Sequence, residues 1–476
     1  MACINAIEHL NAKVHVEEIA DSSNSYHSRG VLAGVVLAAI LFYTLLHQRV
    51  SFDVLAVVSV SVVLLISLAD KRYLIIGWFL VAPYFYPLGL RGEVNIPTNL
   101  SHNLLVPFIA VVILGSTWLQ GRKLALGRED LFFFIFILYI WVSSFYNSIN
   151  SYDNMKTIYS IYIIPYLLFA VIRNIRIDVH WLTVLAYASI FHLVVLSLMG
   201  YYEFRTGLSL YTQVLRWHDV GMGRIAGPFI SPIILGLGVS LYSLCILLAF
   251  NLQKISKLTF SLSMLLSVVL YVLTFTRSVW LGVLASLVYV ILMSPTKPSV
   301  RILKLLGMAG VLVFLTLYLL SFSDVANRVL DSENVNFRIA MAYASVRMIM
   351  ASPIFGWGFG AFDLVIQKFL PNLVWAHMAY DTSHVTLFTL TAELGVVGSL
   401  MLVLFVYRIL SSGNVPIREM SIERQLIVVT NIGFVLAFAV NAFLIDMRFF
   451  SIAYSWFFMS LGMVRNAYLN EDMFAE

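Results

Sequence analysis

Apolar runs of about 20 residues, the length needed to cross a bilayer as a helix, recur from residue 31 to residue 464. Short polar loops separate them, and only helices or closed barrels satisfy their backbone groups inside lipid. The pattern predicts an all-α polytopic integral membrane protein with about 12–14 transmembrane helices. The candidate spans are 31–47, 52–69, 73–90, 101–120, 130–147, 157–173, 180–202, 229–250, 258–275, 278–294, 300–322, 384–410, 424–445 and 447–464.

The composition agrees with a membrane protein. Of the 476 residues, 61% are hydrophobic and only 12% are charged, which excludes an ordinary soluble domain. Residues 1–30 are polar and lack the apolar segment of a cleavable signal peptide, so we expect a cytosolic tail. Cys3 and Cys245 are far apart in sequence, and neither a disulfide framework nor a cysteine metal site is expected.

The distribution of Lys and Arg gives an orientation. With the N-terminus in the cytoplasm, every inward loop is basic, whereas the outward loops of the first half hold only Arg49, Arg91 and Lys156. This orientation places a short C-terminal tail in the cytosol. It places a large helical insert, residues 323–383, on the outer face. The expected regions are a cytosolic tail (1–30), an N-terminal bundle (31–202), a second membrane region that includes the insert (203–466) and a cytosolic C-terminal tail (467–476).

The outward side of the second half carries as many basic residues as its inward side. Pairing with nearby acids is an equally open explanation for Arg328, Arg347 and Lys368. It fits Arg224 and Arg277 less well, because they lie beside predicted spans with no acid within four residues. An unpaired arginine at the membrane surface is a functional-site hypothesis, and its planar fork suits a phosphate ligand.

Three polar residues in or near spans need an explanation. His384, at the outer mouth of a predicted span, is a candidate general base. Glu393 lies inside that span and needs a cation or several donors; it could orient an arginine, bind a sugar hydroxyl or cap helix ends, and we favour a supporting role. His192 lies inside another span and is expected to be a hydrogen-bonded packing residue rather than a ligand.

Several classes of chemistry are not indicated. The chain has no phosphate-binding Gly-x-x-x-x-Gly-Lys-Ser/Thr loop and no outward Asp-x-Asp motif, and no strand precedes the glycines of 356–360. We therefore expect no cofactor, no metal and no nucleic-acid partner. A secondary transporter would show two similar halves with broken helices near the midplane, and the two halves of this chain differ.

Four segments, in order along the chain, resemble the O-antigen ligase and polymerase superfamily. Arg224–Phe229, with Pro232 beyond it, is similar to the family's Arg-x-x-Gly-x-Phe…Pro segment, and Thr276–Gly282 resembles its Ser/Thr-Arg-x-x-Trp-Leu-Gly span start. Ser352–Phe362, preceded by Arg338, resembles the family's Pro-x-x-Gly-x-Gly-x-Gly-x-Phe loop.

The fourth segment resembles the family's His-Asn…Glu-x-Gly-x-x-Gly signature. His384 is followed nine residues later by Glu393, then by Gly395 and Gly398, although Val385 stands where the family often has Asn. The resemblance covers roughly residues 224–400.

The resemblance implies a GT-C-like membrane enzyme of the bacterial inner membrane, with its active site on the periplasmic side. It implies metal-independent transfer of an undecaprenyl-diphosphate-linked glycan to a hydroxyl of another glycan or of lipid A core, beside polysaccharide-export or flippase proteins. By this likeness Arg224 and Arg277 are the diphosphate clamp, Arg338 is a further candidate for it, and His384 is the base. Polymerase and ligase both remain open, and the alternatives from other classes are a transporter or flippase and a structural scaffold.

Overall fold

In the computed structural model, the residues described are 70–85, 100–145, 151–207, 224–229, 231–295, 299–303, 305–306, 332–370, 385–413 and 416–469. The predicted spans 31–47 and 52–69, and most of 300–322, lie outside them.

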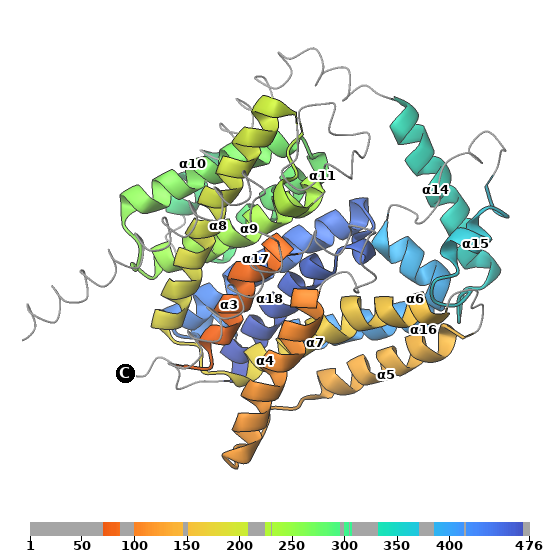
Figure 1. The fold of residues 1–476 in the computed structure, drawn as a ribbon, viewed down its shortest axis with the longest axis horizontal. Coiled ribbons are helices and arrows are strands. Elements are labelled where there is room, and N and C mark those ends of the chain that lie inside the picture. Colours follow the sequence, from red (N-terminus) through yellow and green to blue (C-terminus); the bar gives the residue numbers. More distant parts are fainter. Residues whose placement is uncertain are drawn as a thin grey trace, which may run out of the picture.

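Every regular element in the described part of the chain is a helix, and an all-α polytopic fold is confirmed (Figure 1). Seven of its helices are long and apolar enough to cross a membrane, and Tyr73–Tyr84 and Arg277–Met293 are shorter apolar helices. The helices are α3 (Tyr73–Phe85), α4 (Leu100–Leu119), α5 (Arg128–Ser143), α6 (Ser151–Ile158) with η2 (Tyr159–Ile163) and α7 (Ile164–Asn174), α8 (Val179–Thr206), η4 (Gly227–Phe229), α9 (Pro232–Asn251), α10 (Lys257–Thr274), α11 (Arg277–Met293), α14 (Ser332–Ala351), α15 (Phe362–Ile366), α16 (Thr386–Leu410), η6 (Ile417–Glu419), α17 (Ile422–Leu444), η7 (Met447–Phe449) and α18 (Ser451–Leu469).

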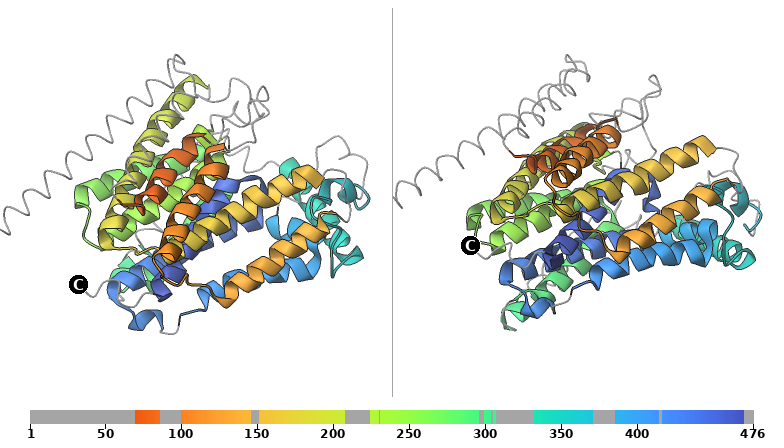
Figure 2. Two further views of the ribbon diagram at one scale, coloured as in Figure 1. Left: turned by 60° about the horizontal axis from the view of Figure 1, so that its bottom comes forward. Right: turned by 90° about the horizontal axis from the view of Figure 1, so that it is seen from below.

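Neighbouring helices run in the directions that the order of spans predicts. Helices α11 and α17 are antiparallel: Gly282, near the start of α11, faces Asn441, whereas Gln425 donates to the Met293 carbonyl at the other end. Helices α7 and α18 run parallel, since Asn466, near the end of α18, donates to carbonyls at the end of α7. The end at which α11, α16 and α18 begin and α10 and α17 finish is called the site end below (Figure 2).

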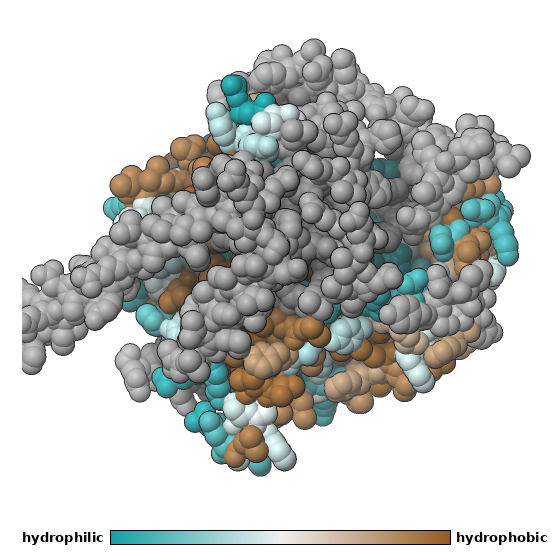
Figure 3. Space-filling model, viewed as in Figure 1, coloured by the Kyte–Doolittle hydropathy of each residue, from teal (hydrophilic) through white to brown (hydrophobic). Residues whose placement is uncertain are grey.

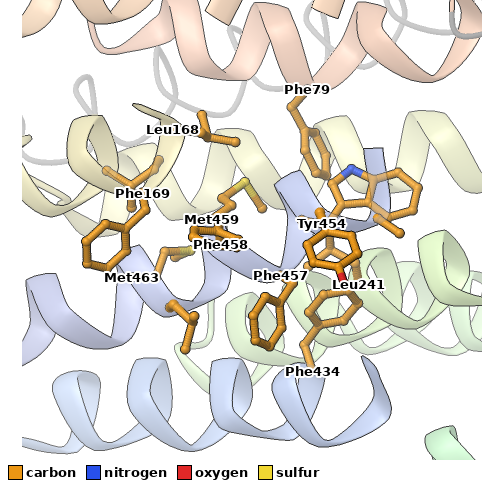
Figure 4. Packing of buried hydrophobic residues seen from close by; sticks show 14 of the residues in the cluster. Phe79, Leu168, Phe169, Leu241, Phe434, Tyr454, Phe457, Phe458, Met459 and Met463 are labelled. Carbon is orange, nitrogen blue, oxygen red and sulfur yellow. The ribbon is translucent and has the colours of Figure 1, made fainter. Parts of the chain in front are cut away.

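Helix α18 forms the centre of the core. Figure 4 shows Tyr454, Phe457, Phe458 and Met459 of α18 pointing in several directions among side chains of the surrounding helices. These neighbours are Phe79 of α3, Leu168 and Phe169 of α7, Leu241 of α9 and Phe434 of α17. Trp456 is also fully buried. Helix α18 therefore packs directly on α7, α9, α16 and α17.

A buried ion cluster fixes the opposite end of the bundle. Arg173 of α7 lies 2.8 Å from Asp130 and 3.5 Å from Glu129 at the start of α5, and Arg465 of α18 lies 2.7 Å from Glu129. The Tyr166 hydroxyl also donates to Asp130. Two acids thus meet two arginines, as buried charges require.

Two helices carry apolar stripes that face outward. Side chains three or four residues apart lie on one face of a helix. On α5 the exposed stripe includes Leu131, Phe134, Leu138 and Trp141, and on α16 it comprises Val396, Leu400, Val403 and Tyr407. Hydrophobic side chains gather over α4 and α5 in Figure 3. These faces have the character of surfaces in contact with lipid tails.

His192 is a packing residue, as expected. Its Nδ1 lies 2.8 Å from the Tyr84 hydroxyl and its Nε2 lies 3.0 Å from the Phe79 carbonyl, and its ring stacks on Tyr242. Both ring nitrogens are thereby occupied inside the bundle.

Candidate functional site

The segment that carries Arg224 is held firmly against the end of α10. The Ile225 amide donates to the Leu273 carbonyl at 3.2 Å. The buried carboxylate of Glu203, in the last turn of α8, accepts from the amides of Ala226 (2.9 Å) and Gly227 (3.0 Å). Gly227 has a φ of 57°, a conformation that favours glycine. The segment therefore has one defined path, and Glu203 is its main side-chain anchor.

The Arg224 side chain reaches the turn between α10 and α11. Its Nε donates to the Thr274 carbonyl at 3.0 Å and its Nη2 donates to Thr276 Oγ1 at 2.8 Å. Phe275, between these two threonines, adopts the left-handed conformation with a φ of 45°. Since Arg277 comes next, the structure brings both arginines to one place. We call Arg224, Thr274, Thr276 and Arg277 the arginine corner.

Arg277 is the first residue of α11 and its side chain is exposed. It makes no hydrogen bond or ion pair with any other part of the chain that the structure describes. The N-terminus of a helix already carries partial positive charge, and the first turn of α11 contains no acid. Arg277 adds to that charge instead of offsetting it, so this position attracts an anion.

Glu393 lies in a second polar group at the site end. Its carboxylate is buried and lies 2.6 Å from Arg448 Nη1, while Arg448 Nη2 lies 3.0 Å from Asp446 Oδ2. Burial lowers the pKa of Arg448, but the two carboxylates outweigh that effect and the pKa is raised. We call Glu393, Asp446 and Arg448 the buried triad; its arginine stays charged and holds Glu393 in place.

Helix α16 is broken at Gly395, and the loop after α14 fills the break. The amides of Trp357 and Gly358 donate to the carbonyls of Ala392 and Glu393, at 3.0 and 2.8 Å. The amides of Val396 and Val397 donate to the carbonyls of Pro353 and Ile354, and the Tyr139 hydroxyl donates to the Leu394 carbonyl. Backbone groups freed inside the membrane region are thus satisfied, as they must be.

Gly395→Ala should destabilise the protein strongly. Gly395 has a φ of 65°, and a Cβ there would overlap the Ile354 carbonyl. An alanine must therefore expel the loop or unwind the helix, and the four hydrogen bonds across the break are lost together. We expect a fall in the melting temperature of the purified protein and loss of transfer activity.

Gly115→Ala is the matched control for Gly395→Ala. Gly115 lies within α4, and a Cβ there would meet no atom within 4 Å. In a helix interior, alanine is favoured over glycine by about 1 kcal/mol. The control should therefore melt at or above the temperature of the unsubstituted protein. Equal melting temperatures for both variants would contradict the importance of the break.

The start of α16 is tied to the buried triad. Thr386 Oγ1 donates to the Ile445 carbonyl at 3.0 Å and accepts from the Met447 amide at 2.9 Å. His384 itself lies outside the described residues, two positions before this threonine. Because α11 and α17 are antiparallel, the start of α11 and the end of α17 occupy the same end of the bundle. The arginine corner, the buried triad and the start of α16 are therefore all at the site end.

Arg338 lies on a different element from the other predicted clamp residues. It is exposed on α14, a helix that packs on α15 and α16 through Met341, Ala344 and Met348. Arg224 and Arg277 instead flank the turn between α10 and α11. The structure thus places two of the three predicted arginines at the same turn.

No metal site is formed by the residues described: within those ranges, no three His, Cys, Asp or Glu side chains lie close enough together to hold an ion. The buried carboxylates of Glu203, Glu393 and Asp446 are instead engaged by arginine or by backbone amides. Metal independence stays a prediction.

Two structural residues of the site were not singled out by the sequence. Glu203 looked like one of several outward acids, and Arg448 like one of several outward bases. Glu203 does precede a polar segment at the end of a span, but the two amides that donate to its carboxylate are more than 20 residues away and leave no local signal. Arg448 is 55 residues from Glu393.

Residues 262–403 match the family described as O-antigen ligase. The matched segment includes Arg277, Arg338, His384 and Glu393, and it ends before Arg448. Arg224 and Glu203 precede it. A comparison with curated proteins finds no match.

Proposed function

We propose that this chain, whose residues 262–403 match the family described as O-antigen ligase, transfers an undecaprenyl-diphosphate-linked glycan to an acceptor hydroxyl at the periplasmic face of the bacterial inner membrane. The family match supports glycan ligation or polymerisation as the general type of activity. The donor lipid, the face of the membrane and the roles of single residues are our proposals.

One observation carries the proposal: the Arg224 guanidinium spans the turn that leads into Arg277. Two guanidinium groups at the end of a bundle of membrane helices suit a diphosphate at the bilayer surface, since arginine binds phosphate oxygens in pairs. The exposed Arg277, without a partner in the described ranges, is available to such a ligand.

The reaction follows from this arrangement. The acceptor hydroxyl attacks the anomeric carbon of the donor, its proton passes to His384, and the bond from that carbon to the diphosphate oxygen breaks. Undecaprenyl diphosphate leaves with the bonding electron pair. The charge that grows on the leaving group meets Arg224 and Arg277, and preorganised positive groups in such a position lower the barrier.

The buried triad has a supporting role in this scheme. Glu393 and Arg448 fix the first half of α16 to the segment after α17. That half-helix begins two residues after His384. A rigid support keeps a general base within reach of the hydroxyl it deprotonates, which is a geometric requirement of the chemistry.

The purified protein in lipid nanodiscs should release undecaprenyl diphosphate from an undecaprenyl-diphosphate-linked glycan when an acceptor is present. We expect the same rate with and without EDTA, because arginines and not a metal ion neutralise the leaving group. Release is measured by chromatography of the extracted lipids. Lengthened lipid-linked glycan identifies a polymerase, and glycan joined to lipid A core identifies a ligase.

Two results would contradict the proposal. Loss of activity in EDTA that is restored by Mg²⁺ would replace the arginine clamp with a metal mechanism. Movement of the intact donor between leaflets, with no release of undecaprenyl diphosphate under either acceptor, would favour the alternative of a transporter or flippase.

A further inference from the structure

Helix α14 exposes an apolar stripe on the side that faces away from the protein. Its buried side consists of Met341, Ala344, Ser345 and Met348. The opposite side carries Ile339, Tyr343, Val346 and Met350, which are 61, 55, 41 and 73% exposed. At 3.6 residues per turn these four fall within about 60° of one another. We call them the α14 stripe; contiguous exposed apolar surface of this kind marks an interaction site.

An arginine stands on each flank of the α14 stripe. Arg338 and Arg347 are both exposed and lie on opposite sides of it on the helical wheel. The Arg347 guanidinium lies 5.9 Å from the centre of the Tyr343 ring. Apolar side chains in the middle and long basic side chains at the edges are the pattern of a helix that lies in a membrane surface.

The α14 stripe continues into a surface of the membrane-spanning part. The exposed side chains of Ile354 and Phe355 follow α14, and the carbonyl of Ile354 accepts from the Val397 amide of α16. The neighbouring Val396 is exposed and begins the outward stripe of α16. The Tyr139 hydroxyl of α5 donates to the Phe355 carbonyl at 2.9 Å. Exposed apolar side chains thus lie at the junction of α14 with α5 and α16.

We propose that α14 lies in the headgroup region of the leaflet at the site end, with the α14 stripe among the acyl chains and Arg338 and Arg347 at lipid phosphates. In Figures 1 and 2, α14 and α15 lie together at one end of the long helices, beside α16. The occupant of this surface is lipid, because the stripe is continuous with surfaces that face lipid and its flanking charges match anionic headgroups. The inference stands independently of the proposed reaction.

Site-directed spin labelling tests this arrangement. Single cysteines at Tyr343, Val346 and Met350, in a chain with Cys3→Ser and Cys245→Ala, carry the label in nanodiscs of phosphatidylethanolamine and phosphatidylglycerol. A cysteine at Gln367, which is exposed and polar at the end of α15, is the matched control. Labels on the stripe should collide more with oxygen, which concentrates in lipid, than with a water-soluble nickel chelate; the Gln367 label should show the reverse.

Either of two other results would overturn the proposal. Stripe labels as accessible to nickel as the Gln367 label would mean that the helix stands in water. Stripe labels protected from both reagents would mean that protein, such as a second copy of the chain, covers the surface.

A double variant tests the arginines separately. Arg338→Gln with Arg347→Gln should shift the Met350 label toward greater nickel accessibility, because two anchors at the phosphates are lost. The same variant with Gln367 labelled should not change, which controls for a general loss of folding. An unchanged Met350 label would remove the arginines from the proposal.

Discussion

Replacing Arg277 by alanine should reduce glycan transfer by about a hundredfold to a thousandfold, the range measured when one preorganised group is removed from developing negative charge. The protein should still insert into the membrane and keep its melting temperature. Arg277 is exposed and has no partner in the described ranges, so its loss leaves no buried group unsatisfied. The measurement is the release of undecaprenyl diphosphate by the nanodisc preparation.

Arg418→Ala serves as the control for Arg277→Ala. Arg418 is likewise exposed, but it lies in η6 between α16 and α17, at the end of the bundle opposite the arginine corner. Its loss should leave transfer unchanged. Full activity in Arg277→Ala would refute the clamp, whereas equal losses in both variants would point to a general effect of removing positive charge.

Arg448→Ala should destabilise the fold by about 3–5 kcal/mol, the cost of removing one partner from a buried ion pair. Arg448 alone neutralises Glu393 and Asp446, both 2% exposed, within the described structure. Without it, two carboxylates remain buried side by side. The expected result is a large drop in melting temperature, measured by tryptophan fluorescence. The amount of protein recovered from the membrane should also be low.

Asp446→Asn provides the comparison for Arg448→Ala. The amide keeps the size of the side chain, and the ion pair of Glu393 with Arg448 at 2.6 Å remains. This variant should therefore melt well above Arg448→Ala. If Arg448→Ala had the same melting temperature as the unsubstituted protein, the buried triad would have no role in holding α16.

The membrane helices could be located from sequence because their signal is local and long. The predicted spans 258–275 and 278–294 became Lys257–Thr274 and Arg277–Met293, which differ by only one residue at each end. Hydropathy locates these boundaries, because the apolar run stops at charged or polar residues close to where each helix begins or ends. The position of Arg277 between two spans followed from the same pattern.

The tertiary contacts at the site end had no comparable signal. Nothing near Glu393 indicates Arg448, because the bundle brings the two together across 55 residues. The break at Gly395 is also invisible to hydropathy: α16 is apolar on both sides of it, and only the packing of the loop at Pro353–Gly358 shows why glycine is required. Arg224 and Arg277 were associated by family resemblance, and the hydrogen bonds through Thr274 and Thr276 supply the physical link.

The central place of α18 has a consequence for biogenesis. This helix comes after the other described helices in the chain, yet its side chains pack among those of α3, α7, α9 and α17. The helices that are inserted earlier therefore cannot complete their packing until α18 has been inserted. A chain that stops before Ser451 would lack this central helix and leave Glu129 without its partner Arg465, so such truncated products should be cleared by membrane proteases.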